Sequence, residues 1–172
     1  MEEIIKKAIN GDEKAFTTLV LNYQQDLYKI ALTRLNSEYD IEEAIQETMI
    51  SAFKNLNSLK EYDKFKKWLI KILINKCNEI YRKKKFKIFS IEDYQNYQIS
   101  NNFSQEIDEK IDFYRIMESL NDKEKIVMVL YYNERYTTKE IAEILNKNEN
   151  SIKTIIHRAK KKLKEKYKKL QE

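Results

Sequence analysis

Residue types that interrupt helices are almost absent from this chain of 172 residues. It contains one glycine, Gly11, and no proline. Proline removes a backbone hydrogen-bond donor and glycine raises the entropic cost of ordering a helix, so their scarcity leaves helical patterning possible from end to end. The sequence therefore predicts an all-α protein.

Cysteine and histidine are equally scarce. Cys77 is the only cysteine and His157 the only histidine, so the sequence predicts neither a disulfide framework nor a zinc site or other metal centre. It also lacks a glycine-rich phosphate loop and any nucleophile–base pair suggested by spacing. We therefore expect no cofactor and no enzymatic activity.

No stretch is apolar enough for a signal core or a membrane span. The first residues, MEEIIKKAINGDEKAF, mix charged and apolar side chains throughout. Signal cores need an uninterrupted apolar run, and a membrane-spanning helix needs about 20 apolar residues. The expected location is cytoplasmic.

Charge, in contrast, is abundant and unevenly distributed. Charged residues make up 35% of the chain, and the net charge is +5. Residues 35–53 hold five acids and no base, residues 64–87 hold ten bases and one acid, and residues 153–169 hold nine basic residues and one acid. One acidic and two basic patches predict two kinds of partner, one basic and one anionic.

Three apolar stripes at helical spacing predict a first domain over residues 1–88. The stripes cover residues 16–31, 41–53 and 65–81, and short polar turns separate them. Asp12 is the expected N-cap of the first helix. Phe53, Trp68, Cys77 and Tyr81 fall on these stripes and are expected to be buried.

Residues 89–106 have little periodicity and are rich in Gln, Asn and Ser, which predicts a linker. Its few apolar residues leave docking on a partner as an alternative to a tether. Residues 107–172 then form a second small helical domain, beginning with a helix that ends near Leu120.

The second domain has the helix starts and the turn that are typical of a helix-turn-helix. Asn121 with Glu124, and Thr137 with Glu140, have capping-box spacing, which predicts two helix starts. Asn146 is expected in the left-handed conformation that glycine often fills. Asn150 or Ser151 is expected to cap the last helix, a long basic one, so the pattern predicts a motif that binds a DNA major groove.

The last helix places its polar residues opposite an apolar stripe. Those expected to face outward, toward DNA, are Ser151, Lys153, Thr154, His157, Arg158 and Lys161. Lys153 and Arg158 can donate to guanine edges or phosphates. The lysines from Lys160 onward fit phosphate contacts, and a solvated basic tail is the alternative.

Three stretches together resemble a known family. YTTKEIAEILNKNENSIKTIIHRAKKKLKE is similar to the promoter-reading helix-turn-helix of bacterial sigma factors, DIEEAIQETMISAFKNL resembles their core-polymerase helix, and FKKWLIKILINKCNEIYRKKK resembles their minus-ten helix. They occur in the family's order. The short chain resembles the extracytoplasmic-function (ECF) group of the sigma-70 family.

The resemblance implies roles for particular residues. Core RNA polymerase would be bound at its beta-prime coiled coil by Asp40, Glu43, Gln46 and Glu47, a merely solvated acidic face being the alternative. The promoter minus-ten element would be bound by Tyr62, Lys64, Phe65, Lys67, Lys71, Asn75 and Arg82. The outward residues of the last helix would read the minus-thirty-five element. Trp68 lies beside an expected base-capturing loop, but core packing is the alternative for its ring.

The resemblance further implies transcription of a stress or envelope regulon and an inhibitory anti-sigma factor anchored in the membrane. This chain departs from the family pattern at Ile155, where an Arg is frequent, and at Asn146, where the turn usually has Gly. An ordinary DNA-binding regulator that dimerises on a palindrome is the main alternative. It leaves the acidic helix and the first basic helix unexplained.

Overall fold

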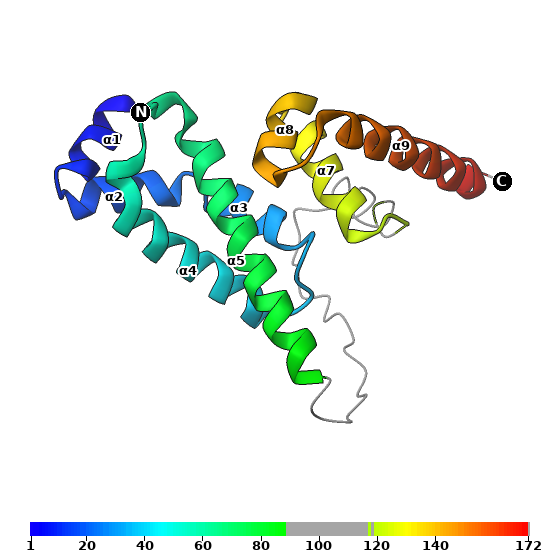
Figure 1. Cartoon of the computed structure of the whole chain (residues 1–172), viewed down its shortest axis with the longest axis horizontal. Coiled ribbons are helices and arrows are strands. Elements are labelled where there is room, and N and C mark those ends of the chain that lie inside the picture. Colours follow the sequence, from blue (N-terminus) through cyan, green and yellow to red (C-terminus); the bar gives the residue numbers. More distant parts are fainter. Residues whose placement is uncertain (89–116, 118, 172) are drawn as a thin grey trace. The chain divides into compact units, whose positions relative to one another are not determined.

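The computed structural model describes residues 1–88, 117 and 119–171. Within these residues the backbone forms α-helices and two short 3-10 helices, with no strand, which confirms the all-α prediction (Figure 1). The chain divides into two compact units, Met1–Gln95 and Asn96–Glu172. The predicted linker at 89–106, and most of the helix expected before Leu120, lie outside the described residues.

The N-terminal unit contains more helices than the sequence predicted. Its elements are α1 (Glu2–Ile9), α2 (Glu13–Leu21), α3 (Gln24–Ala31), α4 (Glu38–Asn55), η1 (Leu56–Ser58), η2 (Tyr62–Lys64) and α5 (Phe65–Ile88). Helix α1 was not predicted, although Ile5 and Ala8 form a short buried stripe. The stripe over 16–31 is split near Tyr23 into α2 and α3 rather than forming one helix.

A tight turn joins α1 to α2. Gly11 has a φ of +91°, a backbone conformation that residues with a side chain rarely adopt. The next residue, Asp12, accepts a hydrogen bond from the Ala15 N–H at 3.0 Å through its carboxylate. The predicted N-cap at Asp12 is therefore confirmed, and the single glycine sits where the turn requires it.

Helix α5 packs against both α3 and α4 (Figure 1). Because it has two neighbours, its buried arc is wider than one stripe and includes Ile70 and Ile74, which the periodicity had left out. Cys77 is buried on the predicted stripe, and desolvation raises the pKa of its thiol to about 12.

Two aromatic residues that were expected in the core are exposed. Phe53 is 47% exposed and Tyr81 is 51% exposed. Each follows the last buried residue of its stripe, Ala52 or Ile80, and consecutive helical positions are 100° apart. The step of one residue carries each ring out of the core, although Phe53 still meets Phe16 edge-on at 5.1 Å.

The C-terminal unit is a helix-turn-helix preceded by a supporting helix. It contains α7 (Asp122–Tyr132), α8 (Thr138–Leu145) and α9 (Glu149–Gln171), and α9 packs against both of the others. Both predicted capping boxes, at the starts of α7 and α8, are confirmed. Their four hydrogen bonds satisfy backbone donors that the first turn of a helix leaves free.

The turn between α8 and α9 follows one sequence prediction and corrects another. Asn146 adopts the left-handed conformation, with φ 50° and ψ 54°, as predicted. Helix α9, however, begins at Glu149, so the predicted cap at Asn150 or Ser151 is wrong. The Asn148 side chain accepts from the Asn150 N–H at 2.8 Å instead, because it is the last residue before the helix.

Candidate functional site

The outer face of α9 carries all the polar residues that the sequence predicted to face outward. Every one is exposed: Ser151, Lys153, Thr154, His157, Arg158 and Lys161. They lie opposite the buried residues Ile152, Ile156 and Ala159, which pack this helix into its unit. An exposed helix face with two or three cations near its start has the form that enters a DNA major groove.

Two hydrogen-bonding groups on this face are already engaged within the protein. The Thr154 hydroxyl donates to the Asn150 carbonyl at 2.9 Å, so its oxygen lone pairs and methyl group remain for an outside partner. The Lys153 ammonium contacts the Glu149 carboxylate at 2.9 Å. Glu149 in turn accepts a hydrogen bond from the Thr138 hydroxyl of α8 at 2.8 Å. The first turn of α9 is therefore tied to α8 by side chains.

The lysines that follow Arg158 do not share one role. The Lys160 ammonium lies over the rings of Tyr131 and Tyr132, 5.3 and 5.6 Å from their centroids. The Lys162 ammonium binds both carboxylate oxygens of Glu124 at 2.8 Å. Lys160 and Lys162 thus both join α9 to α7, whereas the sequence had placed them among phosphate contacts.

Glu124 sits at the centre of this contact and is only 6% exposed. Burial raises its pKa, but the hydrogen bond from Lys162 and the one from the Asn121 backbone outweigh burial and lower the pKa below its ordinary 4.5. The same carboxylate closes the α7 capping box. One buried acid therefore caps one helix and holds another.

The polymerase-binding candidates on α4 do not share one surface. Asp40 is 4% exposed and pairs with Lys84 of α5. Glu47 is exposed and contacts Lys76 of α5 at 3.7 Å, while Gln46 is exposed and Glu43 is half-buried. Asp40 therefore contributes to packing between α4 and α5 in this structure, and the other three reach the surface.

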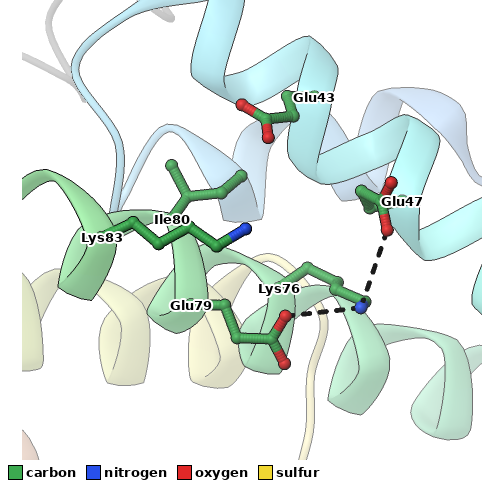
Figure 2. Close-up of a pocket in the computed structure, with 6 residues that line it drawn as sticks. All are labelled: Glu43, Glu47, Lys76, Glu79, Ile80 and Lys83. Carbon is green, nitrogen blue, oxygen red and sulfur yellow. Dashed lines mark hydrogen bonds and ion pairs between the residues drawn. The ribbon is translucent and has the colours of Figure 1, made fainter.

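A shallow pocket of about 130 Å³ lies between α4 and α5. Glu43 and Glu47 project into it from α4, opposite Lys76, Glu79 and Lys83 of α5 (Figure 2). Lys76 binds Glu47 and Glu79 at the same time, the latter at 3.4 Å. The charges of the acidic helix are thus partly balanced within this unit, on the side of α4 that faces α5.

The sequence reasoning missed apolar residues on the outer face of α4. Tyr39 is 73% exposed, and Ile50 and Phe53 are each 47% exposed. With Glu43 and Gln46 they are spaced by four, three, four and three residues, the spacing with which helices meet in a coiled coil. That spacing was readable in the sequence, but Phe53 had been assigned to the core.

The minus-ten candidates divide between the core and the surface. Lys71, Asn75 and Arg82 are exposed on α5, and a hollow of about 420 Å³ is lined by Asn75, Asn78, Glu79, Tyr81 and Arg82. Lys64 is exposed and bonded to Glu61 at 2.5 Å, and Lys67 is half-buried. The sequence had not included Asn78 or Tyr81, which belong to the same hollow.

The aromatic candidates near the start of α5 also differ from one another. Phe65 is 1% exposed, and the centroid of its ring lies 5.7 Å from that of Tyr23 and 5.8 Å from that of Trp68, so its ring is part of the core. A ring buried in this way cannot meet a base while the fold is intact. Tyr62 and Trp68 are half-buried and keep part of their surface accessible beside the loop.

Other kinds of site find no support in the described part of the chain. No group of three or more His, Cys, Asp or Glu side chains lies close enough there to hold a metal ion. None of the helices between residues 1 and 88, or from 119 onward, has the length and apolar character that crossing a bilayer requires.

Two family models match the chain. The model described as Sigma-70 region 2 matches residues 19–87, and the model described as Sigma-70, region 4 matches residues 110–163. The ECF RNA polymerase sigma factor SigW of Bacillus subtilis is 31% identical, with 95% of this chain and 96% of that protein covered. The ECF RNA polymerase sigma-E factor of Haemophilus influenzae is 27% identical, with 92% and 90% covered.

Solved structures show the same fold. CnrH, determined in complex with the cytosolic domain of CnrY, has a TM-score of 0.67 at 21% identity, covering 96% of this chain and 95% of that one. The sigma factor RpoE of Bartonella quintana, determined with the anti-sigma factor NepR, has a TM-score of 0.71 at 21% identity, covering 90% and 98%.

Proposed function

Since this chain belongs to the ECF group of the sigma-70 family, whose members act in transcription initiation, we propose that it directs core RNA polymerase to a specific set of promoters. In this proposal α4 binds the beta-prime coiled coil, α5 and the loop before it bind the minus-ten element, and α9 reads the minus-thirty-five element. The promoters belong to a stress or envelope regulon.

The main support is the surface of α9. Its exposed polar face is the side opposite its core residues, and it begins directly after the capped turn of the helix-turn-helix. Residues in the first two turns of such a helix reach base edges, while later residues drift toward the phosphates. Lys153, Thr154 and Arg158 are accordingly the base-reading residues of the proposal, and Lys161 and Lys164 contact phosphates.

On α4 the proposed contact surface is the outer face together with the adjoining side, where Glu43 and Glu47 line the pocket beside α5. Glu43, Gln46 and Glu47 supply polar groups for a basic coiled coil, and Tyr39, Ile50 and Phe53 supply apolar area at heptad spacing. Asp40 keeps a supporting role through Lys84. This assignment retains three of the four residues that the family resemblance implied.

On α5 the proposed minus-ten surface is the exposed side around Lys71, Asn75 and Arg82, together with the part-exposed ring of Tyr62. An amide and two cations there can bind base edges and phosphates, and a tyrosine beside them can stack on an unpaired base. Phe65 has the role of holding the loop in place.

An inhibitory partner completes the proposal. Two proteins with this fold were solved with CnrY and NepR, and NepR is named as an anti-sigma factor. We expect this chain likewise to be held inactive by an anti-sigma factor, one that is anchored in the membrane and releases it on a signal. Recovery of an inhibitor with the protein pulled from uninduced cells, and its loss after induction, tests this expectation.

Run-off transcription tests the central function. Purified core RNA polymerase of the source bacterium is mixed with this protein and a library of genomic fragments, and the transcripts are sequenced. Initiation at a shared upstream motif only when both proteins are present is the expected result. An ordinary regulator would bind fragments without core and start no transcript, and that outcome would overturn the proposal.

The core-binding surface is tested separately with the double variant Glu43→Lys and Glu47→Lys. Glu47 is exposed and Glu43 half-buried, and they lie four residues apart and thus on one face of α4, so their reversal should weaken binding to core while the helix stays folded. Reversal of Glu2 and Glu3 in α1 is the control for the change in net charge. Equal core affinity of the two double variants would exclude the assignment.

A further inference from the structure

The first turn of α9 contains a side-chain network that includes Lys153, one of the proposed base-reading residues. The Glu149 carboxylate accepts a hydrogen bond from the Thr138 hydroxyl at 2.8 Å, across the turn of the helix-turn-helix. Its Oε1, the same oxygen, lies 2.9 Å from the Lys153 ammonium, one helical turn further along α9. Lys153 is therefore linked to α8 through a single carboxylate.

A lysine side chain is flexible and does not by itself hold its ammonium in one direction. Its ammonium ends a flexible stem with about 2 kcal/mol of rotamer entropy, and it binds as a point charge, unlike the planar fork of arginine. Lys153 is 58% exposed, so core packing does not orient it. A base-reading lysine in this position needs a partner that limits the directions of its ammonium.

We propose that Glu149 is a positioning residue for promoter recognition: fixed by Thr138, it directs Lys153 toward one base pair of the minus-thirty-five element. This inference rests on the proposed function and deepens it. It assigns discrimination between bases partly to a residue that need not touch the DNA.

The carboxylate has a second effect, which does not depend on the DNA sequence. DNA phosphates repel a negative group at the start of the helix that enters the groove, which lowers affinity for every sequence alike. The interaction with Lys153, and next the hydrogen bond from Thr138, lower the pKa of Glu149 below its ordinary value. The group is thus charged at neutral pH. Glu149 should therefore lower nonspecific binding through its charge, and raise the ratio of specific to nonspecific binding through the positioning of Lys153.

A simpler role for Glu149 must be separated from this one. An acid in the first turn of any helix is stabilised by the helix dipole and stabilises the helix in return. Asp122 holds the corresponding first position of α7 in the same unit and is exposed. Asp122→Asn is therefore the matched control, because it removes one first-turn charge without touching Lys153.

The test measures base preference in the complete holoenzyme. Full-length variants are bound to core RNA polymerase and transcribe a promoter library with randomised upstream positions, and preference is read at each position. Lys153→Ala should flatten one position. Glu149→Gln and Thr138→Val should lower preference at that same position, by about three- to ten-fold, and Asp122→Asn should not.

The double variant decides between positioning and stability. If Glu149 acts through Lys153, Glu149→Gln should change no preference further once Lys153 is Ala. Nonspecific binding should still rise in Glu149→Gln, measured on a duplex without promoter elements. Thermal unfolding of each variant shows whether the fold is retained.

The possible failures are distinguishable. If Lys153→Ala flattens a position and Glu149→Gln leaves it intact, the positioning role is wrong while the proposed function stands. If Glu149→Gln and Asp122→Asn lower all preferences equally, Glu149 is only a stabilising helix residue. If Lys153→Ala changes no position, the base-reading assignment of Lys153 fails and the inference fails with it.

Discussion

Glu124 and Lys162 show how one ion pair supports the recognition helix from behind. Lys162 binds a carboxylate that is only 6% exposed, and that carboxylate also closes the α7 capping box. Removing the lysine leaves a buried acceptor short of a donor, which costs about 1–3 kcal/mol. We expect Lys162→Ala to destabilise the C-terminal unit, measured by faster hydrogen exchange of α7 and α9 amides.

The neighbouring Lys161 is the control for this prediction. It is exposed on the outer face of α9, so Lys161→Ala should leave exchange unchanged and should flatten the salt dependence of DNA binding by about 0.9 log units per log unit of salt. Equal exchange rates in the two variants would show that the Glu124 contact contributes no stability.

The same pair has a pH dependence with a defined sign. The pKa of Glu124 is lower in the folded chain than its ordinary 4.5. A lowered pKa means that the unfolded chain binds a proton more readily, so this stabilisation is complete above pH 4.5 and is lost as pH falls through the folded pKa. The Lys162→Ala variant should therefore lose less stability on acidification than the parent. Hydrogen exchange of α7 and α9 amides, compared at neutral pH and below pH 4.5, measures the difference.

Asn146 allows a test of backbone conformation at a single residue. Its φ of 50° is left-handed, a conformation that is unfavourable for most residues with a Cβ, tolerated by asparagine and free of penalty for glycine. We expect Asn146→Ala to lower the free energy of unfolding by about 1–2 kcal/mol and Asn146→Gly to leave it nearly unchanged. Asn133, exposed at the end of α7 with a φ of −81°, is the control, and Asn133→Ala should have little effect in the same denaturation experiment.

At the scale of elements, a substitution on the outer face of α4 should affect core binding without affecting the stability of the fold. Ile50 is 47% exposed, so Ile50→Ser should change stability by less than about 0.5 kcal/mol. If this face docks on a coiled coil, the same change should weaken core binding about ten-fold, as expected for an apolar contact at the centre of an interface.

Leu21 provides a matched control for Ile50. It is 60% exposed on α2 in the same unit and lies outside the proposed surface. Leu21→Ser should leave core affinity unchanged in a direct binding titration. A loss of affinity equal to that of Ile50→Ser would indicate that any exposed serine in place of an apolar residue weakens binding, and would remove the support for α4.

What the sequence could predict follows from how local each feature is. Asn121 and Thr137 start helices through partners three residues away, so their capping boxes were readable from spacing alone. The burial of Asp40 and Ile70 depends on α5 meeting two other helices, and no window of sequence contains that information. Lys160 and Lys162 contact α7 whereas Lys161 is exposed on the outer face of α9, a difference that a run of identical lysines in the sequence does not reveal.

At the scale of the whole molecule, each unit has its own buried core. In the N-terminal unit this core includes Ile30, Ile41 and Leu73, and in the C-terminal unit it includes Leu130 and Ile152. We expect fragments 1–88 and 107–172 each to fold alone, with cooperative unfolding measured by circular dichroism. A fragment that remains unfolded while the whole chain folds would show that its core is incomplete.

The buried thiol of Cys77 can report how often the N-terminal unit opens. It is the chain's only cysteine, and burial raises the pKa of its thiol to about 12, so the folded protein carries very little of the reactive thiolate at pH 7. A thiol reagent can react with Cys77 at the rate of an exposed cysteine only while α5 is separated from the helices packed against it. The rate of thiol labelling therefore measures this opening without any engineered probe. A partner that stabilises the closed unit should slow the labelling of Cys77, and a partner that opens the unit should accelerate it.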